Sequence, residues 1–250
     1  MSYISLDGIW ELYCVISKVQ SSVLGSPITY RISKLNMSQE GSAASNKMYI
    51  SYNNIHKLCQ QVAKTIMERG ERPDVIIAIT GGGMIPARII RSFLKSKGQK
   101  NIPIQAIGLS LYEDLGLDNQ IETIGKEVIR TQWLDFGALD KHFDSLIGKR
   151  ILIVDEVDDT RTTLHYALTE LQKEVREQQV KLNRLNEDTT FSIFVLHNKD
   201  KPKKVELPQD LFDHGRYLAA VTVPDKWLCY PWEAIDIEEH TQLAIEQGNN

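Results

Sequence analysis

Short apolar runs alternate with segments of helical periodicity along most of this chain, and this alternation constrains the fold more than any other feature. The apolar runs that we expect to be strands lie at residues 75–79, 102–109, 150–154 and 191–196. The helical patterns cover residues 52–69, a segment with Pro86 in its first turn, and residues 162–185. Strands that are apolar throughout are typical of a parallel sheet covered by helices on both faces. The sequence therefore predicts an α/β fold with a doubly wound, mainly parallel sheet.

The overall composition is that of an ordinary globular protein. Hydrophobic residues make up 42% of the 250-residue chain, which is enough for a substantial core. The formal net charge of -4 argues against a nucleic-acid binder, because affinity for the phosphate backbone needs a basic excess. No apolar run approaches the ~20 residues that cross a bilayer, so we expect no membrane partner. Cys14, Cys59 and Cys229 have no disulfide or zinc spacing, so we expect a reducing, cytoplasmic location.

Three parts of the chain depart from the alternating pattern. Residues 1–47 lack clear periodicity and end in a polar stretch, so we expect a poorly ordered N-terminal extension before a domain at residues 48–250. Residues 111–140 contain acids, glycines and polar side chains, and a loop of this length is typical of a functional segment. Residues 200–240 are rich in prolines and aromatic side chains, and we expect a small cap built largely from them.

The segment ILIVDEVDDTRTT, residues 151–163, is the most informative part of the sequence. Asp155 and Glu156 come just past the expected carboxyl end of an apolar strand, where open α/β sheets bind their ligands. The acids and threonines that follow turn into a helix, whose backbone N–H groups can cradle a phosphate. A simple helix cap is the alternative, but a cap needs only one or two such residues. Four acids in five positions repel each other unless a cation is present, which favours a phosphorylated ligand with Mg²⁺.

This segment resembles the signature of type I phosphoribosyltransferases, in which an apolar strand and two acids precede a phosphate loop usually written D-T-G-x-T. Arg161 stands where that loop has glycine. Other stretches, such as IIAITGGGMIPARIIRSFLK, LSLYEDLG, RTQWLDF and VPDKWLCYPWE, are similar to fungal purine phosphoribosyltransferases. The similarity extends over most of the chain from Met48 onward. It implies the type I phosphoribosyltransferase fold, with a small cap or hood beside the main sheet.

The resemblance also implies a reaction, in which phosphoribosyl pyrophosphate gives its 5-phosphoribosyl group to N9 of a 6-oxopurine. Mg²⁺ is the implied cofactor, and a homodimer is the implied assembly. We expect xanthine to be the preferred base; hypoxanthine and guanine are the alternative, because one or two side chains in a base pocket decide such preferences. A non-catalytic regulator that senses phosphoribosyl pyrophosphate is a second alternative. The acidic balance and the complete lid and base-binding segments argue against it.

The resemblance assigns a role to each part of the expected site. Asp159 would exchange a proton with N7 of the base. Asp155 and Glu156 would hold the ribose hydroxyls and, with Glu233, the metal. The residues assigned to phosphoribosyl pyrophosphate are Asp155, Glu156, Asp158, Thr160, Arg161, Thr162 and Thr163, and the glycine loop Gly81, Gly82 and Gly83. A lid that excludes water would contain Leu111 and Tyr112.

The purine would be held from two directions. Trp227 would stack on its flat face, with Leu228 beside it. A residue just after the strand at residues 191–196 would contact the 6-oxo group. The sequence leaves open whether that residue is His197 or Lys199.

Overall fold

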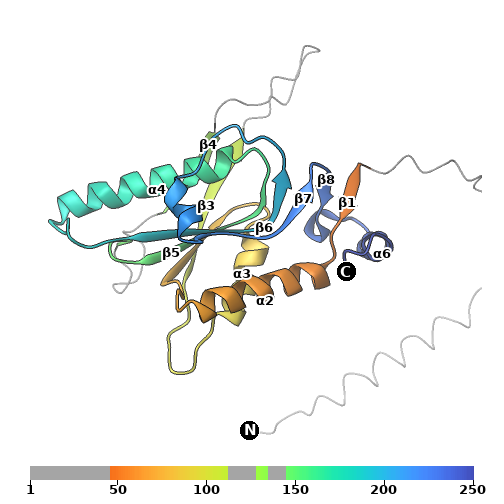
Figure 1. Ribbon diagram of the computed structural model, residues 1–250, viewed down its shortest axis with the longest axis horizontal. Coiled ribbons are helices and arrows are strands. Elements are labelled where there is room, and N and C mark those ends of the chain that lie inside the picture. The colour runs from red at the N-terminus through yellow and green to blue at the C-terminus, as the bar shows by residue number, and fades with distance from the viewer. Residues whose placement is uncertain (1–45, 112–127, 135–144) are drawn as a thin grey trace, which may run out of the picture. The chain divides into compact units, whose positions relative to one another are not determined.

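The main sheet has six strands in the order β4-β3-β2-β5-β6-β7, and every strand except β4 runs parallel to its neighbours. The computed structural model describes residues 46–111, 128–134 and 145–250 (Figure 1). The strands of this sheet are β2 (Val75–Ile79), β3 (Ile104–Leu111), β4 (Val128–Gln132), β5 (Arg150–Asp158), β6 (Thr190–Asp200) and β7 (Tyr217–Pro224). The predicted α/β fold with a mainly parallel sheet is confirmed.

Helices cover both faces of the main sheet (Figure 1). They are α2 (Tyr52–Glu68), α3 (Met84–Phe93), α4 (Thr162–Lys181) and α5 (Gln209–Asp213). Successive side chains of a strand point to opposite faces, so β2 feeds two separate cores. Ile76 and Ala78 pack with α2 and α3, whereas Val75 and Ile77 pack with α4 and α5. Burial on both sides explains why this strand is apolar throughout.

A second, smaller sheet stands beside the main one. Its elements are β1 (Lys47–Tyr49) and β8 (Trp227–Cys229), which pair in parallel, followed by the 3-10 helix η1 (Pro231–Glu233) and α6 (Ile237–Glu246). Asp236 caps α6 by accepting from two N–H groups of its first turn at 3.0 Å. His240 of α6 donates from Nε2 to the carbonyl oxygen of Ile50 at 2.9 Å, which fixes the helix to the chain leaving β1. Residues 200–240 are thus divided between the two sheets, because β7 belongs to the main sheet.

The order of the strands reverses at β2. The chain passes from β2 to β3 on one side, whereas β5 lies on the other side of β2. Such a topological switch point is where open α/β sheets bind their ligands, beyond the carboxyl ends of the strands. The connections that leave β2 and β5 at this point are residues 80–83 and 159–161. The fold therefore places the two segments predicted to bind phosphate next to each other.

Two strands are longer than the sequence predicted. The prediction ended them at residues 154 and 196, where the apolar runs stop. β5 continues to Asp158 and β6 to Asp200, and the register pairs Asp158 with Asn198. The ladder continues because backbone hydrogen bonding does not need apolar side chains. The acid pair therefore lies inside β5 rather than past its end, and both candidates for contacting the 6-oxo group lie inside β6.

Several predictions concern parts of the chain outside the described residues. Nearly all of the expected extension at residues 1–47 lies there, as does Tyr112 of the expected lid, whereas Leu111 is the last residue of β3. Among the described residues, no helix is both long enough and apolar enough to span a membrane.

Candidate active site

The acid pair of β5 packs against the glycine loop that follows β2. A Cβ at Gly82 would overlap the side-chain carboxyl group of Glu156, so glycine permits the carboxyl group to lie where it does. A Cβ at Gly83 would lie 2.6 Å from carbonyl oxygens of both β2 and β5. Gly81 has a φ of 97°, which favours glycine at that position as well. The structure thus brings the predicted ribose-binding acids and the predicted pyrophosphate loop into contact.

The electrostatics of the acid pair suit a cation and hydroxyl donors. Asp155 is 7% exposed, and burial together with the charge of Glu156 raises its pKa well above the usual value. The buried Oε2 of Glu156 accepts no hydrogen bond from the described residues. Mg²⁺ usually binds one or two carboxylates together with substrate phosphates, so these oxygens fit that ion. Within the described ranges, no cluster of three or more His, Cys, Asp or Glu side chains could hold a metal alone.

The connection after β5 leads to a helix N-terminus that can receive an anion. α4 begins at Thr162, and no side chain caps its first turn. The first N–H groups of a helix have no partner within the helix, and they lie at the positive end of its dipole. The hydroxyl groups of Thr160 and Thr162 lie 3.1 Å apart, and Thr163 follows in the same turn. This arrangement suits the predicted binding of a phosphate.

Asp158 is fully buried and binds other parts of the protein. Its Oδ2 accepts from Arg161 Nε at 2.9 Å and from the Tyr217 hydroxyl at 2.6 Å. Its Oδ1 lies 3.5 Å from Lys203 Nζ. Burial, followed by the carboxylate of Asp158, raises the pKa of Tyr217 above its usual value. The side chain of Asp158 therefore fixes the phosphate loop from within, whereas the sequence had suggested a ligand contact.

Arg161 adopts a left-handed backbone conformation at the position where the pattern D-T-G-x-T has glycine. Its φ is 70°, which is unfavourable for a residue with a Cβ. Its side chain is 10% exposed and lies in the ion pair with Asp158. The guanidinium carbon lies 5.5 Å from the ring centre of Phe212 and 5.4 Å from that of Tyr217. These contacts offset the backbone strain, so arginine can occupy a glycine position here.

Asp159 lies in a cluster of alternating charges. Its Oδ1 is 2.8 Å from Lys201 Nζ and 3.4 Å from Lys199 Nζ, and both lysines also pair with Asp225. Burial opposes ionisation of Asp159, but the two lysines outweigh it, so the pKa of Asp159 lies below its usual value. The carboxyl group therefore remains an anion at neutral pH and is able to accept a proton or a hydrogen bond.

His197 and Lys199, the two candidates for the 6-oxo contact, have different surroundings. His197 is 2% exposed, and its Nδ1 lies 2.8 Å from the Tyr230 hydroxyl. That hydroxyl donates its one proton to the carbonyl oxygen of Glu156 at 3.0 Å, so Nδ1 of His197 must be the donor to Tyr230. Burial lowers the pKa of His197 to about 4, which agrees with a neutral ring. Of the two candidates, only Lys199 lies beside Asp159.

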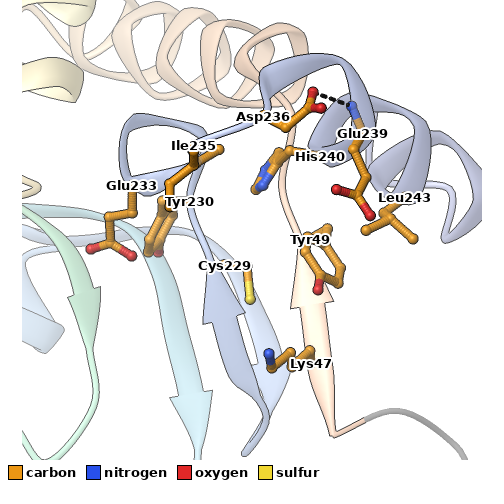
Figure 2. A pocket seen from close by; sticks show the side chains of 11 residues that line it. Lys47, Tyr49, Cys229, Tyr230, Glu233, Ile235, Asp236, Glu239, His240 and Leu243 are labelled. Atoms are coloured by element: carbon orange, nitrogen blue, oxygen red, sulfur yellow. Dashed lines mark hydrogen bonds between the residues drawn. The ribbon is translucent and has the colours of Figure 1, made fainter.

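The second sheet supplies the residues predicted to hold the base and the metal. Trp227 is 66% exposed and offers an open ring face, whereas Leu228 is buried. A pocket of about 560 Å³ lies between β1, β8 and α6 (Figure 2), and Glu233 lines it. Figure 2 shows Glu233 and Tyr230 projecting to the same side, away from α6. Because the Tyr230 hydroxyl reaches the backbone of Glu156, this is the side that faces the acid pair.

Sequence reasoning missed four residues that shape this site. Tyr230 connects β8 to the acid pair, and Lys201 and Asp225 complete the cluster around Asp159. Lys203 donates to the backbone carbonyl oxygens of Asp158 and Asp159, at the start of the predicted phosphate loop. The available signal was the cluster of four lysines at residues 199–204, in a chain of net negative charge. Tyr230 carried no such signal.

Comparison with known proteins agrees with the fold and the site. Residues 47–190 match the family described as the phosphoribosyl transferase domain, and the chain belongs to this family. Xanthine phosphoribosyltransferase 1 of Saccharomyces cerevisiae is 77% identical over 208 residues, which cover 83% of this chain and 100% of the relative. Hypoxanthine-guanine phosphoribosyltransferase of Schizosaccharomyces pombe is 61% identical over 203 residues, covering 81% of this chain and 97% of the relative. The predicted family and its fold are thereby confirmed.

A solved structure extends the comparison to a bacterial protein. It is a hypothetical protein from Neisseria gonorrhoeae with bound ppGpp, and its sequence is 35% identical to this chain. The TM-score is 0.60, and the alignment covers 82% of this chain and 99% of the bacterial one. The fold is therefore shared across nearly the whole length of that protein.

Proposed function

We propose that this protein transfers the 5-phosphoribosyl group of phosphoribosyl pyrophosphate to N9 of xanthine, giving XMP and pyrophosphate. The observation that carries the proposal is the contact between Glu156 and the glycine loop, next to the uncapped N-terminus of α4. These groups match the ribose hydroxyls, the pyrophosphate and the 5-phosphate of one substrate. The 77% identity to a xanthine phosphoribosyltransferase supports xanthine as the base.

The substrate binds along the edge formed by β2 and β5. Asp155 and Glu156 accept hydrogen bonds from the ribose hydroxyls. The N–H groups and hydroxyls of residues 160–163 bind the 5-phosphate at the start of α4. The glycine loop, residues 81–83, lets backbone N–H groups approach the pyrophosphate. Asp155, Glu156 and Glu233, together with the pyrophosphate, would hold Mg²⁺, which would supply positive charge that stabilises the leaving group.

The base is held and activated by three side chains. Trp227 stacks on the purine, and Lys199 contacts its 6-oxo oxygen. Asp159 accepts the N7 proton as N9 attacks C1 of the ribose; the two lysines beside it keep this carboxyl group ionised. The displacement proceeds without a covalent enzyme intermediate.

A cytoplasmic homodimer is the assembly that we infer. The resemblance to fungal purine phosphoribosyltransferases supports the dimer, and the three separated cysteines support a reducing compartment. Light scattering of the purified protein measures the assembly directly, and a monomeric mass would contradict the dimer.

The test of the proposed function is a panel of bases. The purified protein is mixed with Mg²⁺, phosphoribosyl pyrophosphate and xanthine, hypoxanthine or guanine separately, and nucleotide is quantified by chromatography. We expect most product from xanthine. Product mainly from hypoxanthine or guanine would favour the second candidate, which the 61% identity to a hypoxanthine-guanine enzyme supports. Binding of phosphoribosyl pyrophosphate without product from any base would refute catalysis and favour a sensor.

A further inference from the structure

Lys203 occupies an unusual place for a lysine. Its side chain is 9% exposed, and its Nζ donates to three backbone carbonyl oxygens, at 2.8 Å to Asp158, 3.0 Å to Asp159 and 2.9 Å to Lys199. An ammonium group has three donor hydrogens, so these bonds use its whole capacity. Asp158 Oδ1 at 3.5 Å offsets part of its charge. Such a buried, fully bonded cation is costly to desolvate, so a simple surface role does not account for it.

The bonds from this segment orient the peptide groups of the phosphate loop. Lys203 Nζ binds the carbonyl oxygen of Asp159, and the backbone N–H of Lys204 donates to that of Thr160 at 3.1 Å. In a planar trans peptide, the carbonyl and the N–H of the next residue point in opposite directions. The N–H group of Thr160 therefore points away from Lys203 Nζ, and that of Arg161 points away from the backbone N–H of Lys204. Within the described part of the chain, neither N–H group has a protein acceptor.

We propose that Lys203 is a positioning residue for the phosphoribosyl substrate: it holds the carbonyl of Asp159 so that the N–H group of Thr160 faces the 5-phosphate. The N–H group of Arg161 lies in the next peptide, which the backbone of Lys204 holds. This inference rests on the proposed function. Lys203 does not contact the phosphate itself. Its ammonium group affects phosphate binding by orienting the backbone of the loop. The same lysine ties the loop to Lys199 of β6, so the phosphate side and the base side of the site share one anchor.

The first test compares two lysine variants. Lys203→Met removes the ammonium group and keeps the length of the side chain, whereas Lys204→Met changes an exposed neighbour and keeps its backbone N–H. Calorimetry measures the binding of two probes, ribose 5-phosphate and inorganic pyrophosphate with Mg²⁺. Because Lys203→Met removes a charged group that makes hydrogen bonds, we expect its affinity for ribose 5-phosphate to fall about tenfold or more. Pyrophosphate binding and the Lys204→Met control should remain as in the parent protein.

The outcomes separate this inference from the proposed function. Failure of the unaltered protein to bind ribose 5-phosphate would refute the proposed function. Binding by the unaltered protein and equal binding by folded Lys203→Met would overturn the role of Lys203 alone. An equal loss for both probes would indicate general unfolding of the site and also overturn it. Lys203→Arg, which retains a buried cation, should recover part of the affinity.

A second measurement does not depend on whether a variant folds. Hydrogen exchange of the unaltered protein is followed by NMR with and without saturating ribose 5-phosphate. The amides of Thr160 and Arg161 should become protected when the probe binds, because they donate to its phosphate. No added protection at either amide would overturn the proposed orientation of the loop.

Discussion

Replacing Arg161 by glycine tests whether the guanidinium group is what permits a side chain at a glycine position. In the native protein, Arg161 Nε donates to Asp158 Oδ2 at 2.9 Å, and the two side chains are 10% and 0% exposed. The substitution removes this bond from a fully buried carboxylate. It also relieves the backbone strain of a residue whose φ is 70°. The two effects have opposite signs, and their sizes decide the outcome.

The magnitudes favour destabilisation. A hydrogen bond to a buried charged group contributes about 1.5–3 kcal/mol to stability. Relief of left-handed strain returns about 1 kcal/mol, but the added freedom of glycine in the unfolded chain costs about 0.5–1 kcal/mol. Glu206, at 3.6 Å from Arg161 and 82% exposed, adds little because surface ion pairs are weak. We therefore expect Arg161→Gly to lower the free energy of unfolding by about 1–3 kcal/mol.

The assay is equilibrium unfolding in urea at neutral pH without substrate. Asn183 supplies a matched control, because it is the other non-glycine residue with positive φ in the described ranges, at 53°, and its side chain is exposed. Asn183→Gly should be neutral or stabilising by up to about 1 kcal/mol. The reasoning is refuted if Arg161→Gly is as stable as the native protein and behaves like Asn183→Gly. In that case the guanidinium contributes nothing to the fold of the loop.

Three further predictions concern Asp159, Trp227 and His197. Asp159→Asn should lower turnover by about 10²–10⁴-fold and weaken phosphoribosyl pyrophosphate binding far less; equal losses in steady-state kinetics and calorimetry would discredit proton transfer. Trp227→Ala should raise the KM for the base about tenfold or more while pyrophosphate affinity is unchanged, and an unaltered KM would exclude stacking. Burial lowers the pKa of His197 from 6.5 to about 4. The unfolded chain therefore binds a proton at this histidine below about pH 6.5, whereas the folded protein binds it only near pH 4. Native stability should therefore fall by about 3 kcal/mol between those pH values, and His197→Asn should lose less in urea titrations; parallel losses would contradict this.

The strands of the main sheet could be predicted because burial on both faces gives them continuous apolar runs in the sequence. A strand covered on both faces must be apolar at every position, as β2 is. The ends of β5 and β6 are not apolar, so the sequence pattern did not show them. Asp158 remains in β5 because Arg161, Tyr217 and Lys203 provide partners for its buried carboxylate. A side chain 59 residues away cannot be inferred from periodicity, so the predicted strand stopped too early.

The candidate site, like the main sheet, contains residues that the sequence predicted and residues that it did not. The acid pair and the glycine loop were found from the sequence because their residue types are unusual in combination at strand ends. The roles of Tyr230 and Lys203 depend on tertiary contacts with backbone carbonyl oxygens. Every residue has a carbonyl oxygen, so the sequence does not show which ones these side chains contact. We prefer Lys199 to His197 for the proposed 6-oxo contact because the histidine ring is bonded to Tyr230, whereas Lys199 lies beside Asp159. Local sequence thus predicted the groups that we propose to meet the ligand, and it missed the residues that hold these groups in place.

The arginine in the phosphate loop is best understood as one member of a coupled set. A side chain at positive φ needs a compensating contact, and Arg161 obtains it from Asp158. The buried carboxylate in turn needs more than one partner: Tyr217 donates a second hydrogen bond to it, and the ammonium group of Lys203 offsets part of its charge. Lys203 also binds the carbonyls of the loop, so the loop conformation and the charge balance beneath it depend on the same group. Introducing glycine at position 161 alone would therefore leave an acid with too few partners, and the other members of the set would have to change with it.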